Sequence, residues 1–330
     1  MTRKVFFLIA AIAAVAAAPV GGMLVFFNSA AAQSASSDNP GAKQVPIELW
    51  SGDRAMSDIA AQLRFTPRSL DKPGHQQTID YIESQLAKTP LNTIAKQRWN
   101  YRSDDGADHA MTNIIARLDP SNPRRVIVAT HYDSIVRAYR DANKPDAPMP
   151  GANNSASGVA VLLETARALG SLPPPPVGID MIFFDGEEGP KSLGAGDPNW
   201  FALGSPYFTA HLGDFYLTRK PQSAVVFDMV CYNKLRLQPE LSSLYYARSE
   251  TAKFWSIGAA IAPSVFTSAP TAYPVSDDHT ALAQAGIPSF LVIDFDYDPW
   301  FNTTEDTIDK CSAASLADVG QTLLRYLYAK

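Results

Sequence analysis

Side chains that can bind cations gather in three short groups along the middle of the chain. Each group directly follows an apolar run. The groups are His131 to Asp133, Asp185 to Glu188, and Asp228. Carboxylate oxygens and imidazole nitrogens are ligands of zinc and of harder divalent cations. One acidic residue after an apolar run is ordinarily a solvated charge or a helix cap. Three successive groups that include a histidine predict a metal site.

The apolar runs before these groups have the length and composition of buried β-strands. The expected strands are Arg125–Thr130, Val177–Phe184, Ser223–Phe227 and Ser289–Phe295. Helical spacing of apolar residues predicts helices at Gly158–Leu169 and Ser315–Tyr328. This alternation predicts an α/β fold: a single domain with a central mixed, largely parallel β-sheet flanked by helices on both faces. Ligands of such sheets bind at the carboxyl ends of the strands, which is where the polar groups stand.

Composition narrows the possible partners. The chain has 330 residues, of which 46% are hydrophobic and 18% are charged, so it can bury a sizeable core. Its formal net charge of −5 argues against nucleic acid and anionic membranes as partners. Cys231 and Cys311 are the only cysteines, which is too few for a cysteine-rich metal site. The sequence leaves open whether these two cysteines form a disulfide.

The first residues have the pattern of an export signal. Arg3 and Lys4 precede an uncharged, largely apolar run over 5–27, and Ala30 to Ala32 supplies small residues for cleavage. A membrane anchor is the alternative, because the run exceeds the ~18 residues that can span a bilayer. We expect the protein to be exported, either to the periplasm or outside the cell. The expected division is a signal peptide or anchor over 1–32, a polar linker over 33–57 and the α/β domain over 58–330.

Six short segments surround the polar groups. They are THYDS (130–134), GANNSASGVAVLLETARAL (151–169), IFFDGEE (182–188), FDMV (227–230), SDDH (276–279) and WFNTTEDT (300–307). In order and spacing they resemble the zinc-dependent aminopeptidase and glutaminyl cyclase family, over roughly residues 58–328. The GEE and DDH portions are most similar to bacterial glutaminyl-peptide cyclotransferase-like proteins.

This resemblance implies a glutaminyl cyclase-like enzyme that converts the N-terminal Gln of peptides to pyroglutamate at one zinc ion. Glu188 matches a zinc ligand, and Glu187 matches the base that carries a proton from the α-amine to the departing ammonia. Asp228 and Asp278 match acids that hold the hydrogen-bond network around this base. The alternative is a metalloaminopeptidase with two ions, in which His131 and Asp228 hold the second ion. The implied partners are the amino termini of peptides or proteins.

Two positions depart from the family pattern. Asn154 stands where the family has its aspartate ligand, and Asn302 stands where it has its histidine ligand. A neutral amide oxygen is a poor substitute for a carboxylate or an imidazole on zinc. Zinc is therefore the implied cofactor, with weak or absent binding as an alternative.

The substitutions leave three hypotheses for the site. It is empty, or a metal moves toward His131, Asp228 and Glu188, or His279 or Asp296 supplies a ligand. An empty site would make the chain a catalytically inactive descendant that binds peptide amino termini. The retained acids argue against a site with no cation, because clustered carboxylates repel one another and raise their own pKa values.

Residues around the expected pocket complete the candidate list. Cyclases have aromatic walls around the glutamine side chain, so the resemblance implies a substrate-binding role for Trp200 or Trp300, and His279 is a further candidate. Ordinary packing is the alternative for each tryptophan. Thr303, Glu305 and Asp306 are interpreted as caps of the last loop.

Overall fold

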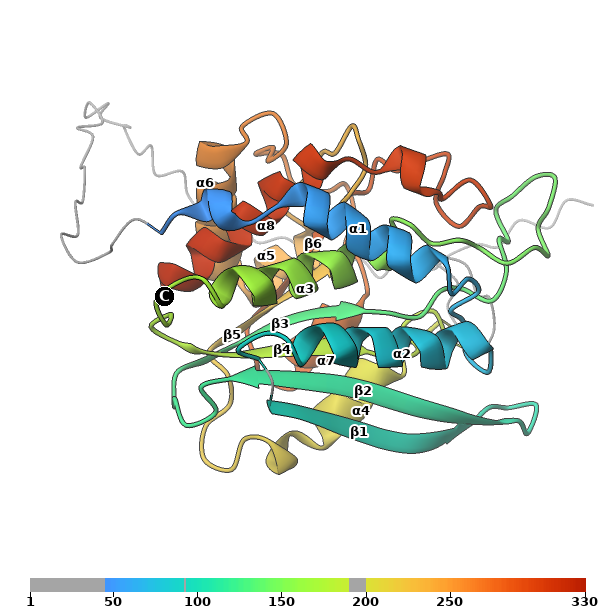
Figure 1. Ribbon diagram of the computed structural model, residues 1–330, viewed down its shortest axis with the longest axis horizontal. Coiled ribbons are helices and arrows are strands. Elements are labelled where there is room, and N and C mark those ends of the chain that lie inside the picture. Colours follow the sequence, from blue (N-terminus) through green and yellow to red (C-terminus); the bar gives the residue numbers. More distant parts are fainter. Residues whose placement is uncertain (1–44, 92, 190–199) are drawn as a thin grey trace, which may run out of the picture. The chain divides into compact units, whose positions relative to one another are not determined.

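The computed structural model describes residues 45–91, 93–189 and 200–330, which contain one six-stranded sheet (Figure 1). The strands are β1 (Thr93–Arg102), β2 (Asp108–Leu118), β3 (Arg125–His131), β4 (Gly178–Phe184), β5 (Ser223–Asp228) and β6 (Ser289–Ile293). Their order in the sheet is β1-β2-β4-β3-β5-β6. The pairs β4–β3, β3–β5 and β5–β6 are parallel, and the pairs β1–β2 and β2–β4 are antiparallel. The predicted mixed, largely parallel sheet is confirmed.

Alternating side chains of the central strands enter two separate hydrophobic cores. Val126 and Val128 of β3 lie in the larger core, which contains side chains of five long helices. These helices are α1 (Gly52–Leu63), α2 (Pro73–Leu86), α3 (Ala156–Leu169), α6 (Arg248–Ile261) and α8 (Ala313–Tyr328). Ile127 and Ala129 lie in the other core, against α4 (Gly204–Ala210) and α7 (Asp278–Gln284). Helices therefore cover both faces of the sheet, as predicted.

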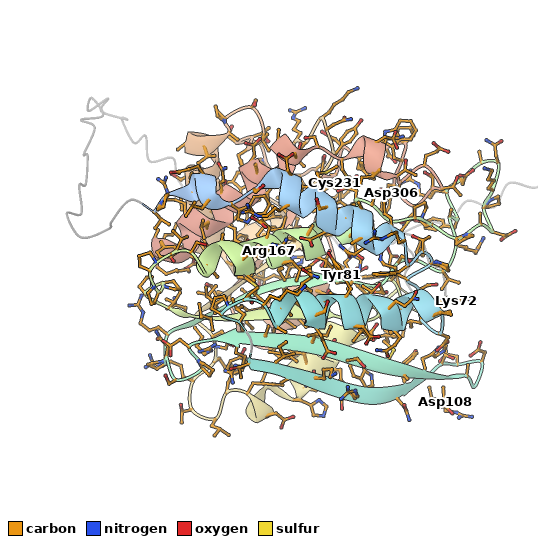
Figure 2. All side chains as sticks on the ribbon, in the orientation of Figure 1. Lys72, Tyr81, Asp108, Arg167, Cys231 and Asp306 are labelled. Carbon is orange, nitrogen blue, oxygen red and sulfur yellow. A yellow bond between two sulfur atoms is a disulfide. The ribbon has the colours of Figure 1, made fainter. Side chains whose placement is uncertain are left out.

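The remaining helical elements are short. They are α5 (Leu241–Tyr246) and the 3-10 turns η1 (Ile47–Leu49), η2 (Leu212–Asp214) and η3 (Ile308–Lys310). A polar contact joins three of the long helices: the Tyr81 hydroxyl of α2 donates to Oδ1 of Asp58 of α1 at 2.6 Å, and Arg167 of α3 pairs with the same carboxylate (Figure 2). Asp58 is buried, so this contact fixes the helices against one another at the sheet face.

The domain begins earlier than the sequence predicts. Trp50 is buried, and its indole Nε1 donates to Oγ1 of Thr165 on α3 at 2.9 Å. Ser51 caps α1, whose apolar residues Ala55 and Ile59 enter the larger core. The expected linker over 33–57 is corrected at its end, because Trp50 and the first turn of α1 pack into the domain. Residues 1–44, with the expected signal and most of the linker, lie outside the described residues.

A disulfide joins two segments that the sequence could not pair. Cys231 lies shortly after β5, and Cys311 lies just before α8; their sulfur atoms are bonded (Figure 2). The bond fixes one end of the loop between β6 and α8. In the part of the chain that the structure describes, no helix has both the length and the apolar character needed to cross a bilayer.

Candidate functional site

The carboxyl ends of β3, β4 and β5 lie at one edge of the sheet. His131 pairs with Phe184 across the parallel β3–β4 ladder, and Asp228 pairs with Ile293 across the β5–β6 ladder. Parallel strands in register end side by side, so the polar residues after each strand come together. The three groups that the sequence singled out therefore do converge.

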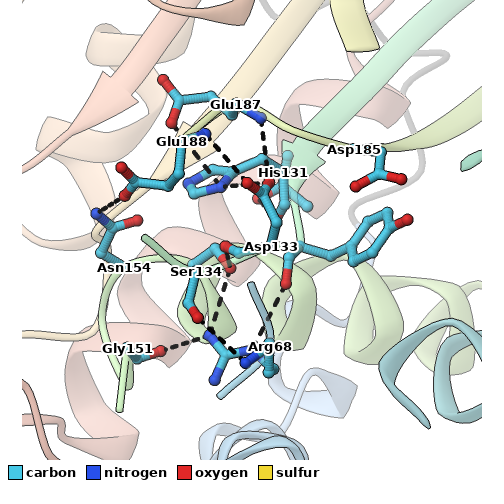
Figure 3. A network of polar contacts seen from close by, with 12 residues as sticks. Arg68, His131, Asp133, Ser134, Gly151, Asn154, Asp185, Glu187 and Glu188 are labelled. Atoms are coloured by element: carbon cyan, nitrogen blue, oxygen red, sulfur yellow. Dashed lines mark hydrogen bonds and ion pairs between the residues drawn. The ribbon is translucent and has the colours of Figure 1, made fainter. Parts of the chain in front are cut away.

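The turn after β4 is held by Asp133. The backbone N–H groups of Glu187 and Glu188 donate to Oδ1 and Oδ2 of Asp133, each at 3.1 Å (Figure 3). Gly186 enables this turn: its φ is 69°, and a Cβ there would lie 2.5 Å from the Met111 side chain. One buried carboxylate thus positions both glutamates.

The loop before α3 is held in the same manner by Asp306. The backbone N–H groups of Asn153 and Asn154 donate to Oδ1 and Oδ2 of Asp306 at 2.9 and 3.1 Å. The Tyr297 hydroxyl also donates to Oδ1 of Asp306, at 2.6 Å. Sequence reasoning interpreted Asp306 as a cap of the last loop and missed that it reaches the segment at 153–154. No local pattern could have shown this, because the partners are about 150 residues apart.

Asn154, Glu188 and Asn302 meet at the centre of the edge. Nδ2 of Asn154 donates to Oε1 of Glu188 at 2.6 Å and to Oδ1 of Asn302 at 3.2 Å. Nδ2 of Asn302 in turn donates to the Tyr139 hydroxyl at 3.4 Å. Asn302 has a φ of 55°, a left-handed conformation that asparagine enters more easily than most residues. All three of the positions that the resemblance assigns to zinc are buried and adjacent.

His131 lies among carboxylates beside these three residues. Its Nε2 is 3.3 Å from Oδ1 of Asp228, and its Nδ1 is 3.4 Å from Oδ1 of Asp133 and 4.0 Å from Oε2 of Glu187. Burial alone would lower the pKa of His131, but the carboxylates of Asp133, Asp228 and Glu187 outweigh it and raise the pKa well above its ordinary value. The carboxylates around His131 therefore favour its protonated form.

Comparison with known proteins assigns the chain to a family. A model of peptidase family M28 matches residues 113–327. The chain belongs to this family. It is 30% identical over 228 residues to Aminopeptidase YwaD of Bacillus subtilis, which covers 66% of this chain and 44% of that protein. It is 27% identical over 289 residues to the glutaminyl-peptide cyclotransferase of Bothrops jararaca, which covers 77% of this chain and 76% of that protein.

Solved structures are similar to this chain over most of its length. A glutaminyl cyclase of Bacteroides thetaiotaomicron has a TM-score of 0.80 at 26% identity, over 87% of this chain and 100% of that chain. A Zn-dependent exopeptidase from Parabacteroides distasonis has a TM-score of 0.77 at 27% identity, over 85% of this chain and 99% of that chain. The resemblance drawn from the six segments is confirmed. This chain spans less than half the length of the Bacillus subtilis aminopeptidase.

The M28 family implies zinc, but the residues at the three matched positions do not fit it. Asn154 directs its amide hydrogens at both Glu188 and Asn302, whereas a cation would need acceptor atoms directed at it. Glu188 is the one ionisable side chain of the three. Among the described residues, no three His, Cys, Asp or Glu side chains are grouped so that they could hold a metal ion. The alternative set of His131, Asp228 and Glu188 is therefore not such a group.

The acids of this M28 edge are shifted toward their protonated forms. Burial raises the pKa of Glu188 to about 8 and that of Asp277 to about 6, and negative neighbours add to the shift. Burial also raises the pKa values of Glu187 and Asp278 well above the ordinary range, although the charge of His131 opposes the shift. These groups can hold a proton near neutral pH, which suits them to proton transfer.

The remaining sequence candidates have different surroundings. His279 is buried in α7, with its Nε2 3.4 Å from Oε2 of Glu240. Trp300 is half-buried and packs at the smaller core, with Nζ of Lys310 lying 4.6 Å from its ring centroid. Trp200 is half-buried at the start of the last described range. Asp296 is paired with Arg236 at 3.9 Å. Asp278 is buried in the first turn of α7, next to Asp277, which caps the helix.

Proposed function

We propose that this M28 protein binds the amino terminus of a peptide at the edge formed by β3, β4 and β5, without the zinc ion of its relatives. The observation that carries the proposal is the amide of Asn154, which joins Glu188 to Asn302 by hydrogen bonds. A donor group occupies the place of a cation, while the acids around it are retained.

The charge of the edge supports an α-ammonium group as the ligand. Buried carboxylates destabilise one another, and His131 supplies one positive charge among them. A ligand ammonium would allow further carboxyls to ionise and to accept charge-assisted hydrogen bonds. The names of the relatives, an aminopeptidase and glutaminyl-peptide cyclotransferases, agree with a ligand of this kind.

Calorimetric titration of the protein from Gln33 onward tests the proposal. A peptide that begins with Gln should bind equally well with and without a strong chelator, and its N-acetylated form should bind at least tenfold more weakly. Elemental mass spectrometry should find far less than one zinc per chain after dialysis against zinc. One zinc per chain, with peptide binding lost in chelator, would refute a metal-independent site.

Cyclisation of N-terminal glutamine is the second candidate function. Glu187, whose pKa is raised, lies 4.0 Å from Nδ1 of His131, and both side chains are buried. In this reaction the α-amine forms a bond to the side-chain carbonyl carbon, the bond to the amide nitrogen breaks, and ammonia leaves. Glu187 would carry the proton from the amine to the leaving nitrogen. Release of ammonia together with pyroglutamate would establish this activity.

The aminopeptidase alternative has less support. Two metal ions need a bridging carboxylate, and the residue at the matched position is Asn154, whose amide hydrogens are already donated within the site. Release of free N-terminal residues from a peptide would support the aminopeptidase alternative.

We further propose that the protein is exported. The bond between Cys231 and Cys311 supports this location, because disulfides persist in oxidising compartments and are rare in reducing ones. Fractionation of cells that produce the full chain tests the proposal: finding the protein in the cytoplasm with both thiols free would overturn it.

A further inference from the structure

Arg68 is a buried cation in the connection between α1 and α2, and no sequence motif points to it. Its side chain is fully buried. Its Nη1 donates to the carbonyl of Pro150 at 2.8 Å. Its Nη2 donates to the carbonyl of Gly151 at 2.9 Å (Figure 3). Nη2 also lies 3.4 Å from Oγ of Ser155. One guanidinium therefore contacts both ends of the loop that carries Asn154.

The same residue reaches the segment after β3. Nε of Arg68 lies 3.5 Å from the carbonyl of Tyr132, and the backbone N–H of Arg68 donates to Oγ of Ser134 at 3.2 Å. Asp133, between these two partners, is the carboxylate that holds the glutamate turn. Arg68 thus links the two segments that bring the site residues together.

The loop is shaped to receive this guanidinium. Gly151 has a φ of 70°, and a Cβ on it would lie 2.9 Å from Nη2 of Arg68 and 2.3 Å from the carbonyl oxygen of Asn154. The negative charges of Asp306, which holds the loop of Asn154, and of Asp133, which holds the glutamate turn, stabilise the buried guanidinium. A buried guanidinium can hold two segments together in two ways. Its hydrogen bonds to carbonyl groups have a fixed direction, and its positive charge attracts the carboxylates of both segments.

We propose that Arg68 is the positioning residue of this edge: its fork sets the loop of Asn154 relative to the turn of Glu187 and Glu188. It touches none of the groups assigned to proton transfer or ligand binding, and acts through Gly151 and Asp133. The inference concerns the site of the proposed function, but its tests do not require that peptides bind.

Hydrogen exchange of backbone amides provides the first test, on the otherwise unchanged protein. Arg68→Lys keeps the charge and removes the fork. We expect the N–H groups of Asn153 and Asn154 to exchange at least tenfold faster than in the parent protein, while the core strands keep their exchange rates. Arg125→Lys is the matched control, because Arg125, the first residue of β3, is also buried and its guanidinium binds Asp180 of β4. This control should lower the melting temperature without selective exchange at 153–154.

Zinc affinity provides the second test, in the variant that carries Asn154→Asp and Asn302→His. Adding Arg68→Lys should weaken zinc binding by about tenfold, the usual effect of losing a group that orients metal ligands. Adding Arg125→Lys should leave it unchanged. If Arg68→Lys matches its parent in both exchange and zinc affinity, or accelerates exchange over the whole domain equally, the positioning role is refuted. Absence of peptide binding would refute the proposed function and leave both readouts intact.

Discussion

The two halves of the candidate site differ in the charges that they have kept. We call His131, Glu187 and Asp228 the acid half, and Asn154, Glu188 and Asn302 the amide half. Every side chain of the acid half is ionisable, whereas the amide half has one ionisable side chain, and hydrogen bonds join its three members. Both halves are buried at the same sheet edge. The difference shows that one edge of an M28 fold can keep ionisable side chains while two of its three matched zinc positions carry amides.

Restoring ionisable ligands to the amide half should have the largest of the expected effects, an increase in zinc affinity. Asn154→Asp together with Asn302→His would give zinc three ionisable ligands with Glu188, and we expect zinc affinity to rise by at least ~100-fold, since first-shell ligands matter more than their supports. Competition with a chromophoric chelator measures the affinity.

Asn153→Asp is the matched control for this restoration. It adds the same charge one residue away, at a side chain whose Oδ1 accepts the N–H of Cys231, and it should not create a zinc site. If the double variant binds zinc no better than its parent, the amide half is not the remnant of a metal site and the comparison fails.

Removing the disulfide should have the next largest effect. It should lower the stability of the protein and loosen the loop that carries Asn302, in the amide half. The bond closes a segment with a sequence separation of 80 residues. Cys231→Ser with Cys311→Ser should lower the free energy of unfolding by about 4 kcal/mol, because the unfolded chain regains the entropy of an open loop. Denaturant titration of the oxidised parent and the double-serine variant measures the difference. A loss below about 1 kcal/mol would mean that other contacts hold the loop of Asn302.

A buried carboxylate outside both halves provides the reference for pH dependence. Burial alone would raise the pKa of Glu240, but hydrogen bonds from His279 and from the backbone N–H groups of Ser242, Val275 and Ser243 outweigh it and lower the pKa to about 2. A lowered carboxyl pKa stabilises the fold above the unfolded value of 4.5, and this stabilisation is lost as the pH falls from there through 2.

We expect up to about 3 kcal/mol of stability to be lost across this acid window because of Glu240. Thermal melting between pH 5 and pH 2 in Glu240→Gln and in the parent protein measures this contribution. The parent should show the steeper fall in melting temperature. Equal slopes would show that the hydrogen bonds to Glu240 do not set its pKa.

Glu187→Gln should have the smallest effect on binding. Glutamine keeps the shape of the side chain but cannot take a proton from an amine, so peptide affinity should change by less than about threefold while any cyclisation rate falls by about 100-fold or more. Titration calorimetry and ammonia release measure the two quantities in the same samples. A large loss of affinity would move Glu187 from proton transfer to ligand binding.

The fold, and the sheet edge at which the site residues meet, could largely be predicted from the sequence. The four expected central strands match β3 to β6 within a few residues, because buried parallel strands are short apolar runs that need no knowledge of their neighbours. The position of His131, Glu187 and Asp228 at one edge followed from parallel topology alone. The start of the domain differs from the expected one, because Trp50 is buried and α1 already begins at Gly52.

The supporting residues could not be predicted. Asp133 and Asp306 each accept two backbone N–H groups, and a carboxylate in a polar segment shows no sign of such a role in sequence. Arg68 was missed for the same reason, because its guanidinium donates to carbonyl groups of segments more than 60 residues away. Backbone partners leave no trace in residue types.

The sequence by itself determined the α/β fold, the M28 motifs and the fact that two expected ligands are amides. The tertiary structure alone decided that Asn154 donates to Glu188 and Asn302, that Cys231 is bonded to Cys311 and that His131 lies between carboxylates. The physical reason is the separation along the chain between the residues that determine each feature. Strand and helix patterns are set by neighbouring residues, whereas hydrogen-bond direction and the pKa of a buried group depend on contacts between distant segments, such as Asn154 and Asn302, which are 148 residues apart.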